Sequence, residues 1–175
     1  MRITVSGPPG SGTTSLSKHL SEKFSFELIS AGEVFRSLAA ERGMSLIEFG
    51  DLCETDPSVD RLIDERQKET GEARDDIIIE GRLAGHMIGN ADLRIWIAAS
   101  AECRTQRIAE RESVDFEASK AETVAREQSE AERYRKYYGI DINDLSIYDL
   151  VINSEKWGVE ELASVVVTAI GKITN

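Results

Sequence analysis

The sequence is poor in cysteine and proline, with two residues of the first kind and three of the second among 175. The cysteines, Cys53 and Cys103, are too few and too far from any spaced partner for a disulfide framework or a zinc site. We expect both to be buried, reduced thiols. A chain of this length can bury a sizeable core without disulfide or metal crosslinks.

Long apolar runs and an excess of basic residues are also missing. No run approaches the roughly 20 apolar residues that span a bilayer, and no cationic segment with an apolar core opens the chain. The 21 basic and 32 acidic side chains give a net charge of −11, which argues against binding to nucleic acid or an anionic membrane. We expect a cytoplasmic protein. Phosphorylated small molecules remain possible partners, because a few arginines in a cleft can outweigh the global charge.

The most informative stretch lies at the start of the chain. A β-branched run over residues 2–6 leads into a glycine-rich turn, and apolar residues follow at helical spacing. Strand, turn and helix in this order are typical of a phosphate-binding loop, where backbone N–H groups and the helix N-terminus hold an anion. The pattern G-x-x-x-x-G-K-[ST] is met at Gly7, Gly12 and Thr14, but Thr13 stands where lysine is expected.

This loop predicts where the phosphates of ATP bind. The Thr14 hydroxyl is the expected Mg²⁺ ligand within it. The alternative is a strand-to-helix turn with no ligand. The expected ATP-binding residues are Gly7, Pro8, Pro9, Gly10, Ser11, Gly12, Thr13 and Thr14.

Helical patterns separate further segments that have the character of strands. Apolar residues that run without a break, as at 76–80, fit a parallel strand covered on both faces. The alternation predicts an α/β fold, a three-layer α/β/α P-loop NTPase with a five-stranded parallel sheet. Because ligands bind beyond the carboxyl ends of such strands, we expect the loops that follow them to converge on one cleft. The strands are expected at 2–6, 26–30, 76–80, 93–98 and 149–153.

The second strand is followed by Ser30-Ala31-Gly32-Glu33-Val34-Phe35-Arg36. This segment resembles the monophosphate-binding segment of nucleoside monophosphate kinases. The resemblance implies that Arg36 binds the phosphate of an acceptor nucleotide, in a subsite that includes Ser30 and Gly32. Taken alone, Arg36 is better explained as an arginine on a solvated helix face.

The third strand ends in Glu80-Gly81-Arg82. This segment looks most like the Asp-Gly-Arg segment of cytidylate kinases. The resemblance implies that Glu80 orients Mg²⁺ through its water ligands, since this cation keeps several waters and accepts few carboxylates. It also implies that Gly81 and Arg82 hold the acceptor or the transferred phosphate. The alternative is a plain ion pair between Glu80 and Arg82.

Arginines recur in the helical region after the fourth strand. Arg104, Arg107 and Arg111 share one helical stripe, and Arg126 and Arg133 repeat a seven-residue spacing. On charge pattern alone, a surface helix laced with salt bridges is the simpler explanation. Monophosphate kinases place arginines before and after a mobile lid. The resemblance implies that Arg107 and Arg111 enter the lid and Arg126 leaves it, with Arg104 as a structural ion-pair partner.

Together these motifs resemble the archaeal-type cytidylate kinases over nearly the whole chain, and that family also has threonine at the lysine position. The resemblance implies phosphoryl transfer from ATP to CMP or dCMP, with Mg²⁺ and with Arg82 and the lid arginines as catalytic residues. It implies a single domain, 1–175, with its core at 1–30, 74–111 and 139–175, a monophosphate-binding region at 31–73, and a lid at about 112–120 with a following helix to 138.

Recognition of the base is expected in the helical region 31–73. Cytosine needs a hydrogen-bond acceptor for its exocyclic amine and a donor for its ring atoms. The candidates that offer these groups are Asp60, Arg61, Asp64 and Arg66. A solvated helix explains these residues equally well. Two other functions stay open: a kinase of the same fold for AMP, UMP or another small acceptor, and a nucleotide-binding module without transfer activity. We expect a monomer.

Overall fold

The computed structural model describes residues 1–173, except for the side chains at positions 46, 47, 54, 57 and 60. Within that range the sheet has five strands, all parallel, in the order β2-β3-β1-β4-β5. The predicted five-stranded α/β fold is confirmed. The strands are β1 (Arg2–Ser6), β2 (Glu27–Ser30), β3 (Ile77–Glu80), β4 (Leu93–Ala98) and β5 (Leu150–Asn153).

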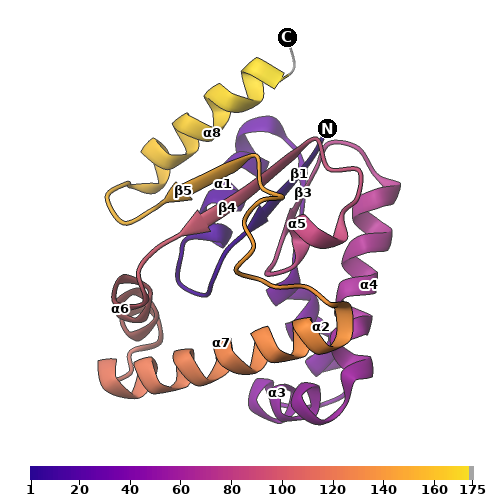
Figure 1. Cartoon of the computed structure of the whole chain (residues 1–175), viewed down its shortest axis with the longest axis vertical. Helices are drawn as coiled ribbons and strands as arrows, with labels where there is room; N and C mark the ends of the chain where they lie inside the picture. Colours follow the sequence, from indigo (N-terminus) through magenta and orange to yellow (C-terminus); the bar gives the residue numbers. More distant parts are fainter. Residues whose placement is uncertain (174–175) are drawn as a thin grey trace.

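Helices cover both faces of the sheet and extend beyond its carboxyl edge (Figure 1). From β1 the chain first forms β2 and β3 on one side of β1 and then crosses to form β4 and β5 on the other side. The strand β1 therefore lies between β3 and β4, at the switch point where ligands bind in such sheets. The helices are α1 (Thr13–Phe24), α2 (Ala31–Glu41), α3 (Leu46–Thr55), α4 (Pro57–Ala73), α5 (Ala84–Met87), α6 (Ala101–Glu112), α7 (Phe116–Tyr138) and α8 (Val159–Ile173).

The main core lies between the sheet and the helices α1 and α8. Side chains from β1 and β4, such as Ile3 and Ile95, pack there against Leu16 of α1 and Val166 of α8. The opposite face buries Ile77 and Ile79 of β3 with residues in and after α5. Burial on both faces explains why β3 has apolar residues at successive positions.

A second, smaller core holds the helical region between β2 and β3 together. Leu38, Phe49, Cys53 and Val59 from α2, α3 and α4 meet in it. Local signals set its helix boundaries: Gly43, at φ +65°, follows the end of α2, and Ser45 and Glu48 form a capping box at the start of α3. This region therefore packs around its own apolar centre beside the sheet.

Three details differ from the sequence-based expectations. The short helix α5 was not expected, because its four residues are too few to show a helical period. The helix α2 begins at Ala31, directly after β2, and so it leaves no loop between Ser30 and the first helical turn. The expectation that both cysteines are buried is wrong for Cys103, which is half-buried in the first turn of α6, whereas Cys53 is buried.

None of the helices in the described part of the chain is both long and apolar enough to cross a membrane. The helical region after β4 is broken between Glu112 and Phe116, where Ser113 has a left-handed backbone and Asp115 caps α7. The helix α7 then runs across the carboxyl side of the sheet, below the ends of the strands (Figure 1).

Candidate functional site

The loop between β1 and α1 has the backbone of an anion cradle. Gly10 and Gly12 both have positive φ angles, of +77° and +101°. A Cβ on Gly10 would also lie 2.6 Å from the carbonyl oxygen of Arg104, closer than real side chains come. The Ser11 N–H donates to the Pro8 carbonyl at 3.1 Å and closes the turn. The predicted phosphate loop therefore requires glycine at Gly10 for two separate reasons.

The hydroxyl groups of this loop include two without a partner. Ser11 Oγ is buried and has no hydrogen bond among the described residues. Thr14 is exposed at the start of α1, and its hydroxyl likewise makes no hydrogen bond in the described chain. A buried hydroxyl without a partner inside an N–H-lined turn fits an anion that would supply the missing bond. The exposed Thr14 hydroxyl fits a metal ligand.

Thr13, in the lysine position of the motif, is turned inward. Its Oγ1 donates to Glu80 Oε1 at 2.8 Å, and Ser30 Oγ donates to Glu80 Oε2 at 2.6 Å. Glu80 is 9% exposed. One carboxylate thus joins the phosphate loop, the end of β2 and the end of β3. A carboxylate has about four acceptor positions, so Glu80 can accept further bonds from bound water.

Gln67 of α4 is part of this arrangement, although the sequence analysis did not select it. Its Nε2 donates to the backbone carbonyl of Glu80 at 2.9 Å, and it is 4% exposed. A sequence signal did exist: Gln67 follows Val59 and Ile63 at four-residue spacing, so that it falls on the apolar side of α4. A polar residue on a buried face needs a partner, which indicates a structural hydrogen bond.

Gly81 brings α2 close to the end of β3. A Cβ there would lie 2.8 Å from the Cβ of Ala31, and the Gly81 N–H donates to the Val5 carbonyl at 3.2 Å. Gly81 therefore acts by allowing close approach, and the next residue, Arg82, emerges at the carboxyl edge of the sheet between α2 and α7.

Arg82 does not pair with Glu80. Its Nε donates to Oε2 of Glu130 on α7 at 2.8 Å, and its Nη2 lies 2.7 Å from the same oxygen in an ion pair. Oε1 of the same carboxylate accepts from Nε of Arg126 at 2.8 Å. Burial alone would raise the pKa of Glu130, but the guanidinium groups of Arg82 and Arg126 hold this pKa below its usual value. Two of the predicted catalytic arginines thus share one buried carboxylate.

The arginines of α6 lie behind the phosphate loop. Arg104 is 6% exposed, forms an ion pair with Glu127 of α7, and donates to the Pro9 carbonyl at 3.2 Å, so the predicted ion-pair role is present. Arg107 donates to the carbonyl of Gly10 at 3.3 Å and to Ser154 Oγ at 3.0 Å. Arg111 is exposed and pairs with its neighbour Glu112.

The other predicted acceptor residues are less enclosed. Arg36 is exposed on α2 and has no hydrogen bond or ion pair with any residue that the structure describes; a Cβ on Gly32 would lie 3.4 Å from its Nη1. Arg61 is exposed on α4, again without such a partner in the described chain. The Asp60 side chain lies outside the described residues. Arg61 therefore makes no hydrogen bond or ion pair with Glu130 in the described chain.

Two open cavities flank the site. One, of about 260 Å³, lies beyond β5 and is lined by Asn153, Glu155, Lys156 and Trp157. It adjoins the phosphate loop, because the intervening Ser154 donates from Oγ to the Ser11 carbonyl at 2.6 Å. No charge or spacing pattern in the sequence marks these four residues as a site.

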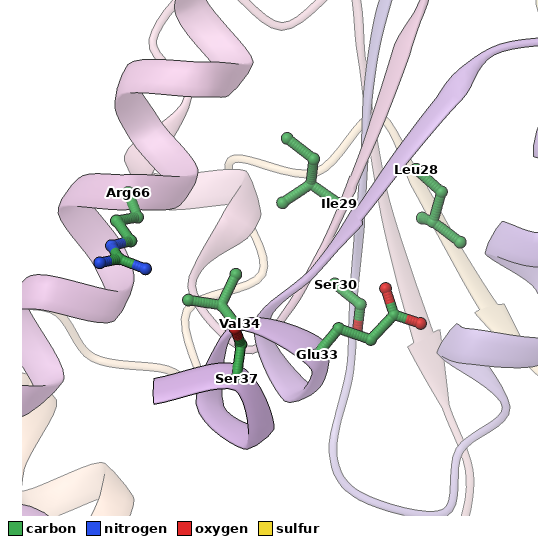
Figure 2. A pocket seen from close by; sticks show the side chains of 7 residues that line it. All are labelled: Leu28, Ile29, Ser30, Glu33, Val34, Ser37 and Arg66. Atoms are coloured by element: carbon green, nitrogen blue, oxygen red, sulfur yellow. The ribbon is translucent and has the colours of Figure 1, made fainter. Parts of the chain in front are cut away.

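The other cavity, of about 290 Å³, lies beside the edge strand β2. Figure 2 shows it between the strand, the first turns of α2 and Arg66 of α4. Its lining includes Ser30, predicted in the acceptor subsite, and Arg66, predicted as a candidate for recognition of the base. It therefore borders the acceptor side of the site, on the flank away from the phosphate loop.

Comparisons with known proteins agree on one family. The model of the cytidylate kinase-like family matches residues 2–156. A cytidylate kinase of Methanoculleus marisnigri is 62% identical over 97% of this chain and 94% of its own length, and one of Methanoregula boonei is 57% identical over 99% and 96%. A shikimate kinase structure from Bacteroides thetaiotaomicron covers 98% of both chains with a TM-score of 0.67 at 12% identity, which shows a shared fold. The chain belongs to the cytidylate kinase-like family.

Proposed function

We propose that the protein is a cytidylate kinase that transfers the γ-phosphoryl group of ATP to CMP or dCMP. One observation carries the proposal most directly. Glu80 joins Thr13 of the phosphate loop to Ser30 at the end of β2, with Arg82 two residues further on. A loop for the donor's phosphates and a cation for the acceptor's phosphate therefore open on the same edge of the sheet. The relatives named cytidylate kinase support the choice of CMP.

The donor is placed on the phosphate loop. Backbone N–H groups from Gly10 to Thr14 and the N-terminus of α1 would hold its phosphates. The cavity beyond β5 would take the base of the donor. It lies next to the phosphate loop, because Ser154 beside it is hydrogen-bonded to Ser11, and Trp157, 45% exposed, offers an aromatic face for the base. Arg107 would stabilise the loop from behind through the Gly10 carbonyl.

The acceptor would bind between α2, the end of β3 and α7. Arg36 and Arg82 would bind its phosphate, with Ser30, Gly32 and Gly81 in the same subsite. This role is supported for Arg36 because its guanidinium has no hydrogen-bond or ion-pair partner in the described chain and is therefore available to a phosphate. The base would lie over the helical region 31–73, near Arg61 and the backbone position of Asp60.

Thr14 and Glu80 are the residues that would hold Mg²⁺, and their surroundings fit it. The Thr14 hydroxyl is exposed and unbonded within the described chain, and Glu80 is an oxygen donor with acceptor capacity left. The bound cation would neutralise charge on the phosphates during transfer. Thr13 and Ser30 hold the Glu80 carboxylate in place for this task.

Phosphoryl transfer asks little covalent chemistry of the protein, and positioning and charge stabilisation carry most of it. The attacking oxygen of CMP belongs to an ionised phosphate, so no general base is needed. Arg82, Arg107, Arg111 and Arg126 are the proposed catalytic arginines. Closure of the segment at about 112–120 with α7 would keep water from the reacting phosphates.

We also propose that the enzyme works as a monomer in the cytoplasm. The phosphate loop, Glu80 and the arginine cluster come from one chain, and Cys53 and Cys103 are free thiols. The overall proposal is tested by incubating the protein with ATP, Mg²⁺ and CMP and separating the products by chromatography. CDP and ADP in equal amounts are expected. Binding of ATP without CDP would indicate the non-catalytic module instead.

A further inference from the structure

Glu130 is the one strongly buried acid of α7 in the described chain. It is 5% exposed, on a helix of 23 residues whose surface is otherwise mostly polar and open to solvent. An ionised carboxylate is costly to bury, so its position needs compensation by charge. Both of its oxygens are compensated, Oε2 by Arg82 and Oε1 by Arg126.

The way in which the two arginines use Glu130 is selective. Arg82 gives it the Nε and Nη2 edge, and Arg126 gives it Nε alone. A guanidinium has five N–H donors, so each arginine keeps several. Nη1 of Arg82 and both Nη atoms of Arg126 have no hydrogen-bond partner among the residues that the structure describes. The carboxylate thus fixes one edge of each guanidinium and leaves another edge open.

We propose that Glu130 is a positioning residue, which holds Arg82 and Arg126 in register so that their open edges meet the phosphate of the acceptor. This inference rests on the proposed function, because it takes Arg82 as a ligand of that phosphate. Arg82 follows β3, whereas Glu130 and Arg126 lie on α7, so the carboxylate also connects the acceptor subsite to the helix that follows the lid. Misplacement of such a clamp costs rate because transfer depends on alignment.

The test compares three variants of the whole protein with wild type. Glu130→Gln removes the charge and can satisfy one arginine at most. Glu130→Asp keeps the charge on a shorter arm. Glu132→Gln is the matched control, since Glu132 is exposed on the same helix and forms no side-chain hydrogen bond or ion pair in the described chain. Each variant is assayed with ATP and CMP at a temperature well below the midpoint of its own thermal unfolding.

Glu130→Gln should lower kcat/KM for CMP tenfold or more and raise KM for CMP, while KM for ATP stays within about twofold of wild type. Glu130→Asp should recover part of the loss, and Glu132→Gln should match wild type. In an Arg82→Ala background, adding Glu130→Gln should cost clearly less than it costs in the wild-type background, because only Arg126 is left for Glu130 to position.

The inference is overturned if Glu130→Gln behaves like Glu132→Gln, if it lowers KM for CMP, or if its full loss persists in the Arg82→Ala background. If Glu130→Gln does not fold, Glu130→Asp decides the question. The inference then requires that Glu130→Asp raises KM for CMP and leaves KM for ATP unchanged. If wild type phosphorylates another acceptor but not CMP, the proposed function fails, and the variants are compared with that acceptor. If wild type phosphorylates nothing, the inference fails with the function.

Discussion

Thr13 donates a hydrogen bond to Glu80 across 2.8 Å in the buried floor of the site, from the position where phosphate loops normally carry lysine. A lysine there would bring an ammonium group toward the same carboxylate. The hydroxyl instead holds Glu80 by a hydrogen bond and adds no positive charge, and Ser30 completes the pair of donors. The missing lysine is therefore replaced by a polar contact that keeps the carboxylate available.

This contact predicts a difference between two substitutions at Thr13. Thr13→Val preserves the shape but leaves a buried carboxylate oxygen of Glu80 without its donor, which should cost about 1–3 kcal/mol of unfolding free energy. Thr13→Ser keeps the hydroxyl and should cost less than half as much. Urea unfolding of both variants measures the difference, and equal losses would show that the hydrogen bond does not matter.

Loss of an arginine that binds the acceptor should lower kcat/KM for CMP and leave KM for ATP unchanged. Arg82→Ala and Arg36→Ala should each lower kcat/KM for CMP by about 100-fold, since a charge-assisted contact to phosphate contributes roughly 1.5–3 kcal/mol and alignment adds to it. Lys18→Ala is the control, because Lys18 is exposed on α1 beyond the loop. A 100-fold loss in Lys18→Ala would instead place the missing lysine's function there.

Gly10 should tolerate no side chain. Its φ of +77° and the 2.6 Å approach of a Cβ to the Arg104 carbonyl predict that Gly10→Ala distorts the phosphate loop. We expect a loss of stability of about 1–3 kcal/mol and a loss of ATP binding of tenfold or more. In Gly50→Ala, on α3, the added methyl meets open space and should stabilise the helix by about 0.5–1 kcal/mol. Calorimetry with ATP and thermal unfolding separate the two effects.

The lowered pKa of Glu130 predicts how acid acts on the protein. Its stabilising contribution is complete above the pKa of an unfolded glutamate, about 4.3, and is lost as the pH falls through the lower pKa of the folded state. Wild type should therefore exceed Glu130→Gln in unfolding free energy at pH 7, and the gap should narrow between pH 5 and about pH 3. A gap that stays constant over this range would contradict the ion pairs with Arg82 and Arg126.

Most of the fold could be predicted from local patterns. The buried run before Glu80, the glycine turn after Ser6 and the capping box at Ser45 are each recorded in neighbouring residues, and the structure confirms them. The helix α5 could not be predicted, since four residues show no period. The half-buried state of Cys103 depends on how the start of α6 packs, which residue type alone does not determine.

The parts of the site that follow from the order of the motifs could be predicted from the sequence. The hydrogen-bond and ion-pair partners of the site residues could not. That the segments after β1, β2 and β3 converge follows from a parallel sheet, and Thr13, Ser30 and Glu80 do meet. The partner of Arg82 could not be predicted, because Glu130 is 48 residues away among many similar acids. The substrate-binding and catalytic roles of the site residues stay predictions, Arg36, Arg61 and Arg111 among them.

The central claim is that the acceptor is a cytidine monophosphate. It is tested most directly by measuring kcat/KM for ADP formation with CMP, dCMP, AMP, UMP and shikimate under the same ATP and Mg²⁺ concentrations. We expect CMP or dCMP to exceed AMP and UMP by at least tenfold, with no turnover of shikimate. A higher kcat/KM for AMP, UMP or shikimate than for both cytidine nucleotides would contradict the account.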